Sequence, residues 1–123
     1  MQRRILFTQG VVVSIIGVLD IYFGVGQSYF WTIWWWDILL HVLGGVWAGL
    51  FGAWVAGFFG IRATFIQCIL FALVIGVGWE IFEYINGLGD SVFMSYTADT
   101  IKDLFDDTLG GAFAYYLVQR ERV

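Results

Sequence analysis

Residues 37–59 read DILLHVLGGVWAGLFGAWVAGFF, an apolar stretch whose only ionisable residues are Asp37 and His41. A membrane-spanning helix needs about 20 predominantly apolar residues, so this stretch is long enough to cross a bilayer. Two more apolar stretches of similar length flank it, at 5–25 and 62–85. The sequence therefore predicts an all-α integral membrane protein.

The composition supports the same class. Hydrophobic residues make up 60% of the 123 residues and charged residues 13%, whereas about 25% is usual in soluble domains. A soluble domain of this size leaves roughly a third of its unfolded-chain surface in water, so it could not hide this much apolar surface. A single cysteine, Cys68, excludes a disulfide scaffold, and a net charge of −4 excludes a basic nucleic-acid binder. The expected partners are membrane lipids, not nucleic acid.

A fourth span is less obvious than the other three. Residues 101–118 begin with acidic residues and become uniformly apolar only from Leu109. We expect this segment to span, because the alternative is an acidic amphipathic helix lying on the membrane surface. For the first span the alternative is a cleaved signal peptide, but Asp20 interrupts its apolar stretch. The prediction is one transmembrane domain over residues 1–123, a four-helix bundle with spans at about 5–25, 37–59, 62–85 and 101–118.

The basic residues indicate the orientation of these spans. Lys and Arg in short loops stay on the cytoplasmic side of a membrane. With four spans, one side receives five of the six basic residues: Arg3, Arg4, Arg62, Arg120 and Arg122. Only Lys102 falls on the other side. The predicted topology is therefore N-in/C-in, with the aromatic run at 29–36 at the outer interface.

Small residues repeat every four positions in two of the spans. The second span carries Gly45, Gly49, Ala53 and Gly57, and the fourth carries Gly110 and Ala114. Small residues at this spacing let helix backbones approach closely in a membrane. Gly45 lies one turn from His41, so we expect the close-contact faces and the polar faces to coincide.

Polar residues of three spans fall at a similar depth. Asp37 and His41 lie at i,i+4, Glu80 and Glu83 at i,i+3, and acids recur every four residues from Asp99. At 1.5 Å per residue, His41, Glu80 and Asp107 each lie roughly 7 to 9 Å below the outer rim. The spans thus bring acidic residues and one imidazole to a single layer in the outer half of the membrane.

This layer needs a neutralising partner, because closely spaced like charges disfavour ionisation and charge inside a bilayer is costly. Lys102 falls about 100° around the helix from Asp103 and is expected to pair with Asp106 instead. The remaining possibilities are a divalent metal, shared protons or a water-filled cavity. Oxygen-rich ligands with one imidazole suit Mg, Mn, Fe or Zn ions. The predicted metal site comprises Asp37, His41, Glu80, Glu83, Asp99, Asp103 and Asp107.

Each residue of this site has an expected role. His41, Asp103 and Asp107 would bind the metal directly, and Asp37 or Asp99 would orient them. The metal would activate water, with Glu80 or Glu83 as general base, for hydrolysis of a lipid or envelope substrate. The alternatives are a cation- or proton-coupled transporter or channel, and a structural or assembly module. The sequence leaves open whether the protein is an enzyme, and whether its partner is a second copy or another membrane protein.

Three short motifs also carry a family resemblance. WWWDILLHVLGG (34–45), GWEIFEY (78–84) and DTIKDLFDDTLGGAF (99–113) resemble, in this order, the YjdF-like family of small bacterial inner-membrane proteins. The last motif is also similar to that of VanZ-like proteins. The resemblance implies a compact, multi-pass helical domain of the bacterial inner membrane with polar motif residues at one end.

Overall fold

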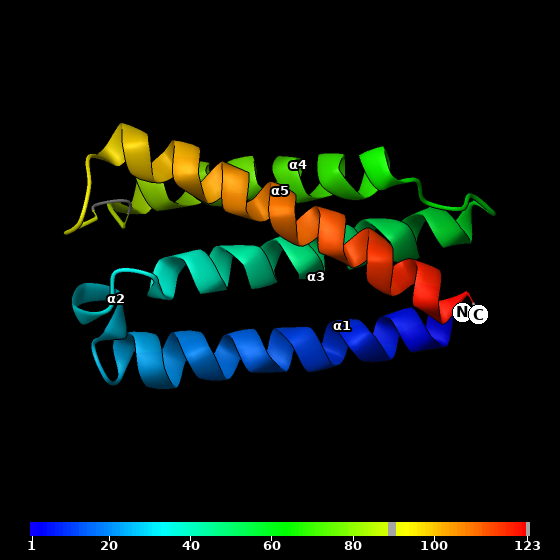
Figure 1. Ribbon diagram of the computed structural model, residues 1–123, viewed down its shortest axis with the longest axis horizontal. Coiled ribbons are helices and arrows are strands. Elements are labelled where there is room, and N and C mark those ends of the chain that lie inside the picture. The colour runs from blue at the N-terminus through cyan, green and yellow to red at the C-terminus, as the bar shows by residue number, and fades with distance from the viewer. Residues whose placement is uncertain (89–90, 123) are drawn as a thin grey trace.

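The computed structural model describes residues 1–88 and 91–122, and this part of the chain is all-helical (Figure 1). The elements in chain order are α1 (Gln2–Gly17), the π-helix η1 (Val18–Val25), α2 (Tyr29–Thr32), α3 (Trp36–Phe58), α4 (Phe65–Asn86) and α5 (Tyr96–Glu121). The N and C ends of the chain lie at the same end of the molecule. The predicted all-α class is confirmed.

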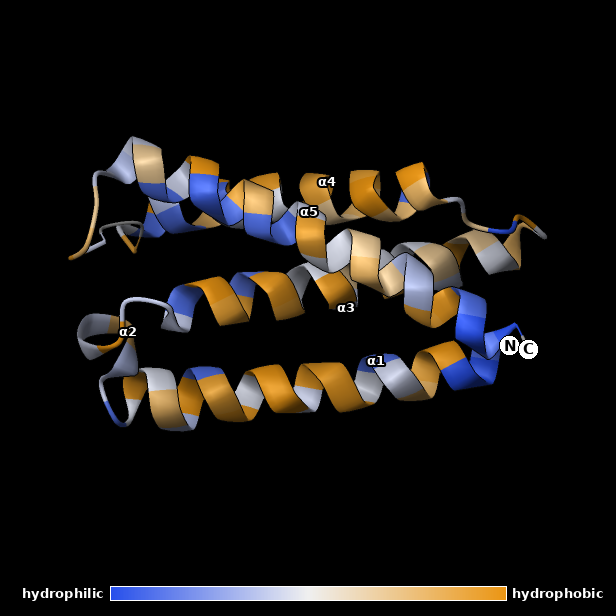
Figure 2. Cartoon of the chain, viewed as in Figure 1, coloured by the Kyte–Doolittle hydropathy of each residue, from blue (hydrophilic) through white to orange (hydrophobic). Residues whose placement is uncertain are grey.

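Within the described residues, three segments are long and apolar enough to cross a membrane: Gln2–Val25, Trp36–Phe58 and Phe65–Asn86. They correspond to the first three predicted spans. Helix α5 is longer, with 26 residues, but its composition does not qualify it. Its first half carries acidic residues and Lys102, and Figure 2 shows blue, hydrophilic positions along that half of the helix.

Side-chain caps set the start of two helices. The Thr64 hydroxyl accepts a hydrogen bond from the Gln67 amide, and the Gln67 side chain accepts one from the Thr64 amide. This capping box satisfies backbone donors that have no partner inside the helix, so α4 begins at Phe65, three residues later than predicted. The Ser95 hydroxyl caps α5 in a similar way, by accepting from the Ala98 amide. Helix α5 therefore begins at Tyr96, five residues before the predicted span.

Helices α3, α4 and α5 pack against one another, and α1 lies along α3 (Figure 1). Over the described residues, no Cα atom of α1 comes within 8 Å of α4. The molecule is thus a three-helix core with α1 on one side. Cys68 is a small buried residue of this core.

Small residues allow the close approach of α3 and α5. A Cβ atom on Gly45 would lie 2.2 Å from the carbonyl oxygen of Asp107, and one on Gly110 would lie 2.1 Å from that of Val42. Real Cβ contacts are never this short, so only glycine fits at both positions. Further along, Gly49 packs on Ala114. The predicted coincidence of small-residue and polar faces is confirmed, because Gly45 faces an acid of the predicted site.

Candidate metal centre

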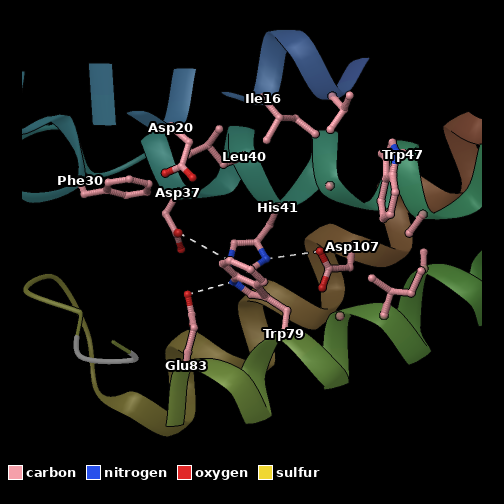
Figure 3. A pocket seen from close by; sticks show the side chains of 16 residues that line it. Ile16, Asp20, Phe30, Asp37, Leu40, His41, Trp47, Trp79, Glu83 and Asp107 are labelled. Carbon is pink, nitrogen blue, oxygen red and sulfur yellow. Dashed lines mark hydrogen bonds and ion pairs between the residues drawn. The ribbon is translucent and has the colours of Figure 1, made fainter. Parts of the chain in front are cut away.

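His41 of α3 lies at the centre of the polar layer, with only 9% of its surface exposed. Its Nε2 atom lies 3.6 Å from Asp37 Oδ1 and 3.3 Å from Asp103 Oδ2. Its Nδ1 atom lies 3.3 Å from Asp107 Oδ1. Figure 3 shows the imidazole between Asp37 and Asp107. Three carboxylates from two helices therefore surround both ring nitrogens of one histidine.

Helix geometry explains this arrangement. Asp37 and His41 are one turn apart on α3, and Asp103 and Asp107 are one turn apart on α5, so each pair shares a face. The contact at Gly45 brings the two faces together. On the opposite side, Gly76 of α4 leaves room for the second oxygen of Asp107, because a Cβ there would lie 2.2 Å from Asp107 Oδ2.

Two overlapping sets of side chains have metal-binding spacing. Asp37, His41 and Asp103 form one set, in which one ligand atom from each lies within 4.8 Å of the others. Glu80, Glu83 and Asp103 form the second set by the same measure. Because Asp103 belongs to both sets, the five residues form one continuous cluster between α3, α4 and α5.

The two glutamates of α4 have different surroundings. Glu80 is buried, with 7% exposed; its Oε2 accepts a hydrogen bond from Thr100 at 3.1 Å. Its Oε1 is buried and has no hydrogen-bond partner among the described residues. Glu83 is half-buried, and its Oε1 accepts from the Trp79 indole at 2.9 Å (Figure 3). Glu80 therefore offers a free oxygen inside the protein, whereas Glu83 lies at the edge of the cluster.

Lys102 contacts the cluster: its predicted pairing with Asp106 is confirmed, but the expectation that it does not pair with Asp103 is wrong. Its ammonium group donates to Asp37 Oδ2 at 2.9 Å, to Asp103 Oδ1 at 2.5 Å and to Asp106 Oδ2 at 3.4 Å. The long, flexible side chain curls back over the 100° that separate it from Asp103 around the helix. Lys102 therefore supplies part of the positive charge that the layer needs.

The structure does not bring all seven predicted metal-site residues together. Asp107 contacts His41 but lies outside both ligand sets. Asp99 also lies outside both sets and lines a cavity nearer the outer end. The remaining five are Asp37, His41, Glu80, Glu83 and Asp103.

Two cavities meet at the cluster. The outer cavity, of about 370 Å³, is lined by Asp99, Lys102 and Asp103 among others. The inner cavity, of about 290 Å³, is lined by His41, Asp107 and mostly apolar residues (Figure 3). Five residues line both cavities: Asp20, Phe30, Asp37, Trp79 and Glu83. The acidic–histidine cluster thus stands where an apolar inner space meets an outer space that also carries charged residues, among them Asp99 and Lys102.

Sequence reasoning overlooked two neutral members of the site, Thr100 and Trp79. Trp79 and Glu83 are four residues apart on one helix, and this spacing could have predicted the hydrogen bond between their side chains. Thr100 bonds to a residue of another helix, so no local spacing could have indicated that contact.

Fold and site together define an all-helical membrane protein with a buried acidic–histidine cluster. Residues 1–122 match the family described as "Predicted membrane protein (DUF2238)", and the chain belongs to this family. The match agrees with the resemblance to small YjdF-like membrane proteins. The resemblance to VanZ-like proteins stays a prediction. No curated protein and no solved structure matches the chain.

Proposed function

We propose that α5 is a fourth span and that the protein is a single multi-pass domain of the bacterial inner membrane, N-in/C-in. The large side chains exposed along α5 form an apolar stripe at spacings of three and four: Ile101, Phe105, Leu109, Phe113 and Tyr116. Its acids Asp103, Asp106 and Asp107 are instead buried against the other helices. A helix with this distribution can face lipid along the stripe from Ile101 to Tyr116 while its acids stay buried. The shared location of both chain ends supports an even number of crossings.

We propose further that the cluster binds a divalent metal. The observation that carries this proposal is the position of the two nitrogens of His41. Nδ1 is held by Asp107, while Nε2 faces Asp37 and Asp103. Histidine ligands of metals commonly donate their second N–H to a carboxylate, which fixes the tautomer and the ring orientation. In this assignment Asp37 binds the metal and Asp107 orients His41, so the roles expected from sequence are exchanged.

The charge and the free oxygens of the cluster support a bound cation. Six carboxylates meet there: Asp37, Glu80, Glu83, Asp103, Asp106 and Asp107. Lys102 and a protonated His41 would together balance only two of them. Glu80 adds a carboxylate oxygen within 4.8 Å of an oxygen of Asp103, and its Oε1 is buried with no hydrogen-bond partner among the described residues. An oxygen-rich set with one imidazole suits Mg²⁺, Mn²⁺, Fe²⁺ or Zn²⁺.

The chemistry that this arrangement best supports is hydrolysis of a lipid or envelope substrate. A bound divalent ion supplies Lewis acidity and makes water a better nucleophile. Glu83, which lines both cavities, accepts one proton from the attacking water. The water oxygen forms a bond to the acyl carbon or phosphorus while the bond to the leaving oxygen breaks. Glu83 then returns the proton to that leaving oxygen, so substrate and water give an acid and an alcohol.

Chelator competition tests the metal site directly. Detergent-solubilised protein is titrated with Zn²⁺ or Mn²⁺ against a chromogenic chelator. We expect one high-affinity site in the parent, its loss in Asp103→Asn, and its retention in Asp99→Asn. The Asp99→Asn variant is the matched control, because Asp99 lies on the same helix and outside both ligand sets. Equal affinities of the two variants would contradict the assignment.

A structural role is the second candidate function, because Lys102 already joins Asp37, Asp103 and Asp106. In that case the network of ion pairs holds α3 and α5 in register, and a divalent ion adds no stability to the folded protein. Thermal unfolding separates the two functions. A stability that does not change when metal is added or chelated favours the structural role, and a metal-dependent increase favours the metal site.

A further inference from the structure

The inner cavity has the form of a slot within the membrane-spanning part of the protein. Along α3 it extends from Asp37 to Ala48, about 16 Å at 1.5 Å per residue. Beyond the polar layer its walls are apolar and come from three helices: Ile16 of α1, Trp47 of α3, and Ala72 and Ile75 of α4. It reaches from the outer polar layer to about the middle of a hydrocarbon core that is about 30 Å thick.

The exposure of lining residues on α1 and on α4 indicates that the slot is open to the side between these two helices. These helices form two of its walls, on opposite sides of the space in Figure 3, and over the described residues no Cα atom of α1 lies within 8 Å of a Cα atom of α4. Wall residues on both edges are exposed, Val13 by 48% and Trp79 by 47%. Because both helices are apolar enough to span, this opening faces the acyl chains of the bilayer.

The end of the slot that meets the outer cavity is polar, and one of its carboxylate oxygens has no hydrogen-bond partner among the described residues. Asp107, almost fully buried, lines it, and its Oδ2 atom has no hydrogen-bond partner among the described residues. The cluster residues also divide between the two cavities: His41 lines the inner one, Asp103 the outer one, and Asp37 both. A molecule occupying both spaces would therefore place its polar–apolar junction at the cluster.

We propose that the two cavities form a binding site for a membrane amphiphile. Its apolar chain lies in the inner slot, which it reaches laterally between α1 and α4. Its polar head lies in the outer cavity beside Asp99 and Lys102, and the bond joining head to chain lies beside His41 and Asp37. The inference rests on the proposed metal-dependent hydrolysis and specifies its substrate class, a lipid cleaved between head and chain.

The physical chemistry of the bilayer explains why both cavities are needed. Moving an acyl chain from lipid into an apolar slot gains little free energy, because lipid tails are as apolar as the slot. Selectivity must therefore come from the polar group that the slot delivers to the cluster. A soluble substrate would leave the apolar walls unused, whereas a lipid fills them without leaving its leaflet.

Gly44 provides a specific way to block the slot. It lines the inner cavity, and a Cβ atom there would meet no other atom within 4 Å. A leucine side chain at this position therefore starts from an open point on the slot wall, and we expect Gly44→Leu to occupy part of the slot. Gly78→Leu is the matched control, because its Cβ also meets nothing within 4 Å and Gly78 lines neither cavity.

The experiment uses vesicles of phosphatidylethanolamine and phosphatidylglycerol containing a trace of phosphatidylethanolamine with a diazirine in one acyl chain. Full-length protein is photolabelled and the modified residues are mapped by mass spectrometry. We expect label on Ile16, Trp47 and Ile75 in the parent and in Gly78→Leu, and its loss in Gly44→Leu. Val74, exposed by 68% and absent from the cavity lining, should be labelled in all three and serves as the internal reference.

Two results would overturn the proposal. In one, the three slot residues stay unlabelled in the parent while Val74 is labelled, as when a neighbouring helix fills the slot. In the other, Gly44→Leu leaves their labelling unchanged. Metal content, measured on the same samples, tests the metal-dependent hydrolysis separately. Labelling of the slot residues in metal-free protein would support the lipid site and contradict the hydrolytic role. Bound metal without labelling of the slot residues would support the metal site and contradict the lipid site.

Discussion

Gly45 in α3 lies so close to Asp107 in α5 that a Cβ on the glycine would stand 2.2 Å from the aspartate's carbonyl oxygen. This backbone contact sets the spacing of the two helices one turn from His41. It therefore determines whether Asp107 can reach the imidazole. Packing and site chemistry depend on the same pair of residues.

A Gly45→Ala substitution should separate α3 from α5. Overpacking of this kind typically costs about 1 to 3 kcal/mol of unfolding free energy. The control is Gly44→Ala, in the next position along the chain, where a Cβ meets nothing within 4 Å. The free energies of unfolding of the two variants are compared by titrating detergent-solubilised protein with SDS. Equal stability of the two variants would show that the α3–α5 contact tolerates a methyl group.

An Asp107→Asn substitution should weaken metal binding without abolishing it. Losing a carboxylate that orients a histidine ligand typically lowers affinity about 10- to 100-fold. Chelator competition measures this loss beside Asp103→Asn, for which we expect no high-affinity site. If both variants lose all binding, Asp107 is itself a ligand, as the sequence had suggested.

Much of this site follows from local sequence spacing. The pairs Asp37–His41 and Asp103–Asp107 are each one helical turn apart, and the small residues at Gly45 and Gly110 indicate which helices approach closely. Helix periodicity and apolar length were enough to predict the all-helical class and three spans.

Contacts that depend on side-chain conformation were not predictable. A helical wheel places Lys102 about 100° from Asp103, yet its long side chain spans that angle and joins three acids. Asp99 continues the fourfold spacing of Asp103 and Asp107, but it lies outside both ligand sets. The capping box of Thr64 also places the start of the third helix at Phe65 instead of Arg62, because Thr64 and Gln67 each accept a hydrogen bond from the other's backbone amide.

A Lys102→Met substitution should couple stability to metal more strongly. The variant loses the hydrogen bonds that Lys102 donates to three carboxylates, typically worth about 1.5 to 3 kcal/mol each, so the metal-free variant should unfold more readily than the metal-free parent. Because a competing positive charge is gone, divalent ions should bind more tightly. Melting temperatures with and without Zn²⁺ or Mn²⁺ measure both effects. If Lys102→Met melts at a lower temperature than the parent, and added metal changes the melting temperature of neither protein, the result would favour the structural role of the network.

A Glu83→Gln substitution should keep the metal and lose catalysis. A positioned general base typically contributes about 10²- to 10⁴-fold to a rate. Bacterial lipid extract is incubated with metal-loaded protein in micelles, and released head groups and lipid acids are quantified by mass spectrometry. Product release by Glu83→Gln at the parent rate would remove Glu83 from the mechanism.

Cysteine labelling tests whether α5 spans the membrane. In a background lacking Cys68, Thr97→Cys should react with an impermeant maleimide on intact spheroplasts. Arg120→Cys, at the other end of α5, should react only after permeabilisation. Both positions are exposed, so access depends on the side of the membrane alone. Labelling of Arg120→Cys on intact spheroplasts would place both ends of α5 outside.

The most direct test of the metal centre is elemental analysis of protein purified without a polyhistidine tag. The account predicts a divalent transition metal or magnesium in stoichiometric amount in the parent and in Asp99→Asn, and its loss in His41→Ala. Parent protein that takes up no metal after incubation with Mg²⁺, Mn²⁺, Fe²⁺ and Zn²⁺, while remaining folded, would contradict the account.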